Sequence, residues 1–144
     1  YVTSLAIAPS VIDYYLGLLP GVIASHARRR LFPISPLDAS SRPLSRKLLE
    51  RPRILSQIRA LIPDPDRAHL VPFNTTSLER DLAVALGIPM YGCDPKHFPL
   101  GTKTGCRRIF AELGVNHPIG VEGLTSEDDL AGLPACALPI GAAR

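Results

Sequence analysis

Cysteine, aromatic residues and long apolar runs are all scarce in this sequence, and each scarcity excludes a class of protein. The three cysteines among 144 residues are odd in number and irregularly spaced, so neither a disulfide framework nor a structural zinc site is predicted. No apolar run reaches the roughly 18–20 residues that cross a bilayer. The longest, residues 11–24, is interrupted by Asp13, Gly17, Pro20 and Gly21. Aromatic residues make up 6% of the chain, too few for a surface that stacks nucleic-acid bases.

Basic residues are only slightly more numerous than acidic residues. There are 16 basic and 13 acidic residues, and the one dense basic cluster is Arg28–Arg30. We therefore predict no nucleic-acid partner and no membrane partner. With no signal peptide in the sequence, we expect a cytoplasmic protein. Apolar residues make up 46% of the chain, which is enough for one packed domain, or for one domain and part of a second.

Short strand-like segments alternate with helical patterns along the chain. This alternation predicts an α/β fold in which a small doubly wound parallel sheet is covered by helices. Strands are expected at residues 1–4, 31–34, 69–73 and 88–91. Helices are expected at residues 9–19, 45–62, 76–86, 104–113 and 126–130.

Two of the expected helices carry specific signals. Thr76 and Glu79 have the spacing of a capping box, and Gly87 follows as a stop signal for the same helix. Pro52 lies inside the helical pattern of residues 45–62. Because proline removes a backbone donor and clashes with the preceding turn, this region is predicted to be kinked or to form two abutting helices.

Both ends of the sequence look cut. The chain begins at Tyr1 in what reads as the second half of a strand, so we expect a lost segment before it. A domain boundary is expected near residues 98–101, with one N-terminally truncated domain at 1–99 and the beginning of another at 100–135. Residues 136–144 contain Ala-Leu-Pro-Ile, which a common sequencing-adaptor end encodes, and are predicted to be read-through rather than protein.

The segment from Val71 to Val121 resembles the entry into an ATP-grasp enzyme. It holds a Leu-Gly-Ile-Pro turn, a strand that ends in Tyr-Gly, a loop with Lys103, and a helix that ends in Glu-Leu-Gly-Val-Asn-His-Pro. Earlier segments, at residues 1–4, 11–21 and 42–53, are similar to the pre-ATP-grasp domain of bacterial peptide ligases of the pheganomycin type. The resemblance implies a Rossmann-like pre-ATP-grasp domain followed by the truncated start of an ATP-grasp domain.

The resemblance also implies an activity. Such ligases use ATP to phosphorylate a carboxylate, and an amine then attacks the acyl phosphate to form an amide or peptide bond. ATP and Mg²⁺ would be the cofactors, and small-molecule or peptide carboxylates and amines would be the partners. The magnesium ligands of the family lie later in its chains, so none is assigned. The chain is thus expected to be an inactive fragment of a carboxylate-amine ligase, with no catalytic residue of its own.

Lys103 is the candidate ligand for an ATP phosphate. It precedes a helix, where an arriving phosphate would accept backbone donors and offset the unfavourable place of a lysine at the positive end of the helix dipole. The alternative is a solvated surface lysine. Asn74, Thr75 and Thr76 are candidate substrate-binding residues because they follow a predicted strand, and ligands bind outside the carboxyl ends of parallel strands.

Thr3 and Ser4 are substrate-binding candidates for the same reason, since they follow the first predicted strand. Capping and turn formation are the structural alternatives for all these polar residues. A non-catalytic α/β domain that binds a nucleotide or another small ligand is the alternative function. A phosphate-binding P-loop is disfavoured because the glycine spacing before Lys103 does not fit. Cys93, His97 and Cys106 match no usual zinc pattern, and no metal ligand is predicted.

Overall fold

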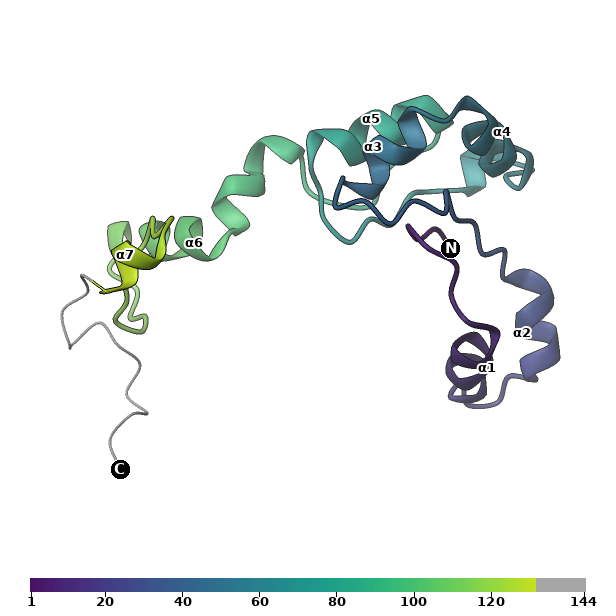
Figure 1. Cartoon of the computed structure of the whole chain (residues 1–144), viewed down its shortest axis with the longest axis horizontal. Helices are drawn as coiled ribbons and strands as arrows, with labels where there is room; N and C mark the ends of the chain where they lie inside the picture. The colour runs from purple at the N-terminus through teal and green to yellow at the C-terminus, as the bar shows by residue number, and fades with distance from the viewer. Residues whose placement is uncertain (132–144) are drawn as a thin grey trace. The chain divides into compact units, whose positions relative to one another are not determined.

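The structure is a computed structural model that describes residues 1–131 (Figure 1). The chain divides into two compact units, residues 1–92 and the residues from Cys93 onward. The domain bounds expected at 1–99 and 100–135 remain predictions. Cys136 and the tail at 136–144, for which read-through was expected, lie outside the described residues.

Helices and connecting loops build the first unit. Its elements are α1 (Pro9–Gly17), α2 (Ala24–Arg30), α3 (Leu44–Leu49), α4 (Pro52–Ala60), the 3₁₀-helix η1 (Pro65–Arg67) and α5 (Ser77–Leu86). Helices α3 and α4 each pack against α5, whereas α1 and α2 pack against each other as a helical hairpin. Figure 1 shows these two groups of coiled ribbons joined by extended chain.

The predicted α/β fold with a doubly wound parallel sheet is wrong. In residues 1–131 no strand forms, and the four segments expected to be strands meet only as two isolated parallel bridges, Val2 with Ile34 and Leu70 with Met90. Proline accounts for the difference, because it cannot donate to a ladder of backbone hydrogen bonds. Pro33, Pro72 and Pro89 lie within or beside the expected strands. The apolar residues of these segments therefore pack without extending a sheet.

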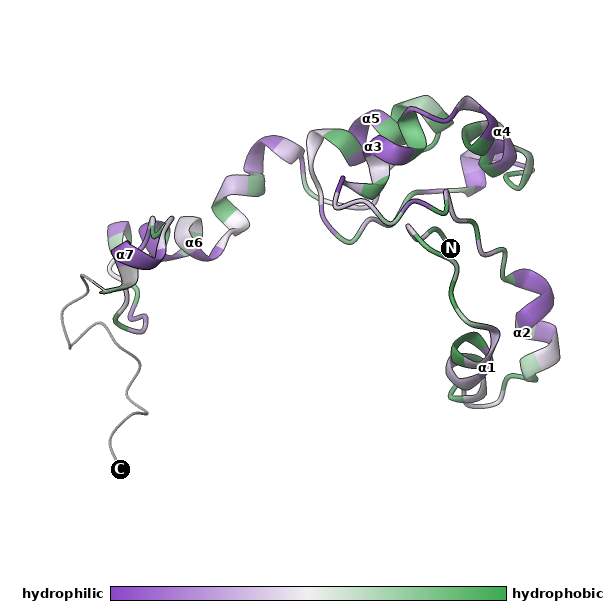
Figure 2. Cartoon of the chain, viewed as in Figure 1, coloured by the Kyte–Doolittle hydropathy of each residue, from purple (hydrophilic) through white to green (hydrophobic). Residues whose placement is uncertain are grey.

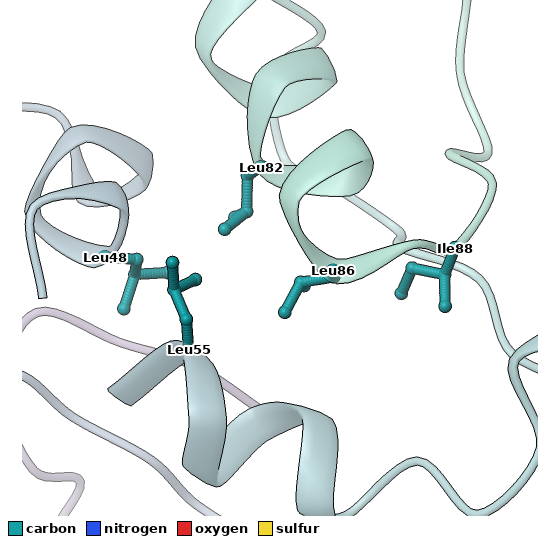
Figure 3. Packing of buried hydrophobic residues seen from close by; sticks show 5 residues of the cluster. All are labelled: Leu48, Leu55, Leu82, Leu86 and Ile88. Atoms are coloured by element: carbon teal, nitrogen blue, oxygen red, sulfur yellow. The ribbon is translucent and has the colours of Figure 1, made fainter. Parts of the chain in front are cut away.

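A small apolar core holds α3, α4 and α5 together (Figure 3). Leu48 of α3 is 1% exposed, the most deeply buried apolar side chain of this cluster. The buried members are Leu48, Leu55, Leu82, Leu86 and Ile88. Val2 and Leu70, one from each bridge, pack against the same cluster. The bridges thus place extended chain beside the helical core without forming a layer of their own.

The local signals around α3, α4 and α5 are confirmed. Helix α3 ends before Pro52, which occupies the first turn of α4, so the expected break yields two abutting helices. Thr76 caps α5 with both hydrogen bonds of the capping box to Glu79, and Gly87 ends the helix at φ 71°. A left-handed residue at this position favours glycine, because other residues pay a steric cost for it.

The expected helix at residues 9–19 is found as α1, but its partner α2 was not expected. The sequence of α2, Ala-Ser-His-Ala-Arg-Arg-Arg, has no apolar period that could signal a helix. Ile12 is the buried residue of α1. Most other apolar side chains of α1 are exposed, so the hairpin contributes little to the core.

The second unit contains the 3₁₀-helix η2 (Pro95–Gly101), α6 (Lys103–Glu112) and α7 (Glu127–Ala131). Helix α6 packs against η2. Arg107 of α6 holds the following loop, since it donates to the carbonyls of Pro118 and Gly120 and pairs with Glu122. Among the described residues of both units, none of the helices is long and apolar enough to cross a membrane. The cytoplasmic location remains a prediction.

Candidate functional site

Lys103 is the first residue of α6, and its side chain is exposed. Thr102 caps the helix, because its Oγ1 accepts a hydrogen bond of 3.0 Å from the backbone of Gly105. Gly105 is required at this place, since a Cβ there would come within 1.9 Å of the Pro99 carbonyl oxygen. The geometry fits an ordinary capped helix start, and the phosphate-binding role of Lys103 remains a prediction.

Asn74, Thr75 and Thr76 lie at the turn that enters α5. The Thr76 side chain is occupied by the cap, since its Oγ1 accepts from Leu78 N at 3.2 Å and donates to Glu79. Thr75 faces Gly92, where a Cβ would lie 2.8 Å from the threonine Oγ1. Asn74 is exposed. The structure therefore gives Thr76 a capping task, and substrate binding by these three residues remains a prediction.

Thr3 and Ser4 also have structural partners. Thr3 Oγ1 donates to the carbonyl of Leu5 at 2.7 Å, and Thr3 N donates to the carbonyl of Ile34 at 3.1 Å. Ser4 Oγ accepts from the ammonium of Lys47 at 3.1 Å. Substrate binding by Thr3 and Ser4 remains a prediction as well.

Helix α3 connects both groups of candidate residues. Its Ser45 donates to Glu79, the partner of Thr76, at 2.6 Å, whereas its Lys47 binds Ser4. Burial raises the pKa of Glu79, but the hydrogen bonds from Ser45 and Thr76 outweigh this effect and leave the pKa below its ordinary value. The two groups are thus linked through side chains of one helix.

Lys47 is the centre of a buried polar cluster that the sequence analysis missed. Its side chain is 1% exposed, and its ammonium donates to the carbonyls of Asp38 at 2.8 Å and Ser40 at 2.7 Å as well as to Ser4. Arg51 completes the cluster, because it donates to the Asp38 carboxylate at 2.7 Å and to the Lys47 carbonyl at 2.8 Å. No local pattern in the sequence marks this cluster, because Arg51 lies outside α3, in the connection to α4.

The Asp38 carboxylate is held ionised. Hydrogen bonds from Ser40 and then from Arg51 place the pKa of Asp38 well below its ordinary value, with a smaller contribution from the charge of Lys47. An ammonium that donates all three protons has no lone pair to attack an electrophile, so Lys47 is not built as a nucleophile. The cluster joins separate segments of the chain, so its role is to stabilise the fold.

Metal binding has no support in the described part of the chain. Among residues 1–131 no group of three or more His, Cys, Asp and Glu side chains lies close enough to hold an ion. Cys93 and Cys106 are both free thiols, and Cys106 donates from its Sγ to the Leu100 carbonyl. This donation gives the Cys106 thiol a local structural partner.

The α1–α2 hairpin leaves several large apolar side chains exposed. Val11, Tyr14 and Tyr15 of α1 follow the i, i+3, i+4 spacing of one helical face, and Leu18 and Leu19 continue this spacing just beyond the end of the helix. These five side chains are 44–64% exposed. Tyr14 and Tyr15 contact each other edge to face. Exposed apolar side chains that gather in this way mark interaction sites on proteins.

Positive charge gathers at the end of α2. Arg28, Arg29 and Arg30 form the last turn of α2, and Arg28 lies 3.4 Å from the carboxylate of Asp13 on α1. Figure 2 shows strongly hydrophilic colour on part of α2, whereas α1 carries hydrophobic and hydrophilic colours side by side. Arg29 and Arg30 are exposed. The hairpin therefore combines an open apolar face with a basic end.

Comparisons with known proteins give one distant relative. The chain is 32% identical over 136 residues to "IQ motif-containing protein H" from Danio rerio; the match covers 83% of this chain and 13% of that protein. The chain thus spans only a small part of the relative. No family model matches the chain, and no solved structure gives a significant match.

The predicted resemblance to ATP-grasp ligases is wrong. The described chain is helical and lacks the parallel sheet of a pre-ATP-grasp domain, and the protein to which it is similar bears the name of an IQ motif. The functional labels that followed from this resemblance, ligase and peptide ligase, fall with it. ATP and Mg²⁺ as cofactors, and carboxylates and amines as partners, remain predictions that no contact in the described residues tests.

Proposed function

We propose that the chain is a protein-interaction module whose α1–α2 hairpin binds an acidic partner protein with an apolar groove. The open face of α1 carries this proposal. Tyr14 and Tyr15 are each 64% exposed there, and tyrosine is among the residues that dominate binding energy at protein interfaces. Insertion of such a face into a groove is a recurring way in which proteins recognise helices.

The charge of the hairpin indicates the chemistry of the partner. Arg28, Arg29 and Arg30 lie at the end of α2, and the one acidic residue of the two helices, Asp13, neutralises only one of them. A basic amphipathic segment is typical of calmodulin targets and of segments that lie on membranes. We favour the protein partner because the basic residues gather at one end of the hairpin, whereas a membrane-bound helix carries them along its polar face.

The relative supports a protein partner only in a general way, through its name. An Ile-Gln pair would be needed for a matching motif in this chain. This chain has no such pair, because its single glutamine, Gln57, follows Ser56 and precedes Ile58. The proposal therefore rests on the surface of the hairpin and not on a motif carried over from the relative.

Calmodulin is the probe that tests this proposal, because its Ca²⁺-loaded form exposes a Met-rich apolar groove. The full 144-residue chain is titrated with calmodulin in a calorimeter, with Ca²⁺ and with a chelator. We expect binding with Ca²⁺ and none with the chelator. Replacement of Tyr14 and Tyr15 by Ser should weaken binding about tenfold or more, since truncation of a central aromatic side chain costs at least ~1–2 kcal/mol.

Val84→Ser is the matched control. Val84 is 75% exposed on α5, so it is an apolar surface residue outside the hairpin, and its replacement should leave the affinity unchanged. Equal weakening by both variants, or no binding by the unaltered chain, would refute the proposal. Binding to anionic phospholipid vesicles with no binding to calmodulin would replace it by a membrane-surface role.

A further inference from the structure

The two ends of the α1–α2 hairpin are fastened to each other. The N-terminal segment, residues 1–4, runs parallel to the return segment, residues 32–38. Ile34 N donates to the Tyr1 carbonyl at 2.9 Å, and Thr3 N donates to the Ile34 carbonyl at 3.1 Å. The Ser4 carbonyl then accepts from Ser35 Oγ and from Asp38 N, both at 3.0 Å. The hairpin is thus a loop whose base is closed by backbone and serine hydrogen bonds.

Lys47 fastens this closed base to α3. Its ammonium reaches the N-terminal segment at Ser4 Oγ and the return segment at the Asp38 carbonyl, and a third proton goes to the Ser40 carbonyl. All three acceptors belong to the chain on either side of the hairpin, and α3 belongs to the core through Leu48. A buried polar group is costly unless its hydrogen bonds are made, so removal of one partner destabilises the remainder of the cluster.

We propose that Lys47 is a latch that holds the base of the α1–α2 hairpin against the core and thereby presents the hairpin to its partner. The presentation rests on the function proposed above, whereas the latch itself does not. While Ser4 is bound, the face of α1 is held by a base of fixed geometry. When the latch opens, Val2 at the core and the ion pair of Asp38 with Arg51 are left to hold residues 1–38, which can then move away more readily while α3, α4 and α5 remain packed. A binding surface that must first be ordered binds more weakly, because ordering consumes part of the binding energy.

Ser4→Ala is the sharpest test, because it removes one acceptor of Lys47 and leaves the lysine bonds to both carbonyls in place. Hydrogen exchange of the Ile34 amide reports opening of the base, since this amide donates to the Tyr1 carbonyl. A hydrogen bond to a charged group stabilises the closed base enough that its loss should raise the exchange rate of the Ile34 amide about tenfold or more. Amides of α5 should exchange at an unchanged rate.

Thr3→Ala is the matched control, because the Thr3 hydroxyl bonds only within its own segment, to the Leu5 carbonyl. It should leave exchange at Ile34 unchanged. A second variant, Lys47→Met, keeps the length of the side chain and removes all three donors, so it should raise exchange further. Unchanged exchange at Ile34 in Ser4→Ala, or equal acceleration in Thr3→Ala, would overturn the latch.

A calmodulin titration of Ser4→Ala separates this inference from the function on which its binding part rests. If the unaltered chain binds calmodulin, Ser4→Ala should weaken the affinity while the contact residues of α1 stay intact. An unchanged affinity with faster exchange at Ile34 would show that the latch holds the base without controlling the surface, which overturns the presentation role. If the unaltered chain does not bind, the proposed function fails, and the exchange experiment still decides whether the latch exists.

Discussion

The capping box of α5 permits a prediction whose size follows from the structure. Thr76→Ala removes the Oγ1 that accepts from Leu78 N and donates to Glu79. Loss of an N-cap hydroxyl costs about 1 kcal/mol, and up to ~2 kcal/mol in well-packed sites. Because the Thr76 backbone and Ser45 still donate to Glu79, we expect the free energy of unfolding to fall by about 1–2 kcal/mol.

Thermal unfolding of the first unit, followed by far-UV circular dichroism, measures this loss. A change of 1 kcal/mol lowers the Tm of a domain of 60–100 residues by about 4–8 °C. Asn74→Ala is the control, since Asn74 is exposed at the preceding turn and its replacement should change stability by less than ~0.5 kcal/mol. An unaltered Tm in Thr76→Ala would refute the assignment of this threonine to the cap.

The same box predicts a dependence on pH. The pKa of Glu79 lies below its ordinary value in the folded chain, so the unfolded chain binds the proton more readily. The stabilisation by this carboxylate is therefore complete above the unfolded pKa, about 4.3, and is lost as the pH falls through the folded pKa. In Thr76→Ala the carboxylate has one donor fewer. The loss of stability on acidification should be smaller than in the unaltered chain, and parallel pH profiles would contradict the reasoning.

Two further predictions concern the core and the end of α5. Leu82→Ala empties a site that is 4% exposed between α5 and its neighbours, so urea unfolding should show a loss of about 2–5 kcal/mol. Gly87→Ala meets no atom within 4 Å, so its cost is backbone strain at φ 71° alone. This strain should lower the free energy of unfolding by about 1–2 kcal/mol in the same assay, and a stabilised Gly87→Ala would contradict the left-handed assignment.

Helix α5 shows what the sequence alone can predict. Thr76, Glu79 and Gly87 act on backbone groups within a few residues of themselves, so their effect does not depend on the remainder of the fold. The break before Pro52 is of the same kind, because a proline ring clashes with its own preceding turn. Rules that act over only a few residues predicted helices α3, α4 and α5, with bounds close to those observed.

The prediction of a sheet was wrong because strand pairing depends on partners that are distant in sequence. An apolar run of four or five residues suits a buried strand and an extended segment beside a core equally well. The prolines at residues 33, 72 and 89 argue against a sheet, since each removes a donor where a ladder would need one. Within residues 1–131 these segments form two isolated parallel bridges, Val2 with Ile34 and Leu70 with Met90.

Lys47 was missed because nothing local marks it. A lysine within a helical pattern normally faces solvent, and its burial depends on acceptors that the chain supplies from residues 4, 38 and 40. The periodicity of Leu48 and Leu55 indicated the buried face of this region, but it did not indicate that Lys47, beside Leu48, would also be covered. Polar clusters of this type follow from tertiary packing and are visible only in a structure.

The expectation that Thr3, Ser4 and residues 74–76 bind substrate presupposes a sheet. Ligands bind at the carboxyl ends of parallel strands because the helices that follow present free backbone donors there. Without a sheet, polar residues at the same positions first satisfy backbone and side-chain groups close to them, as Thr76 does in its cap and Ser4 does with Lys47. If this argument is correct, replacement of either residue should change stability or local opening before it changes the binding of any small ligand. We expect surface recognition from residues that have no such local task, among them the exposed Tyr14 and Tyr15 of α1.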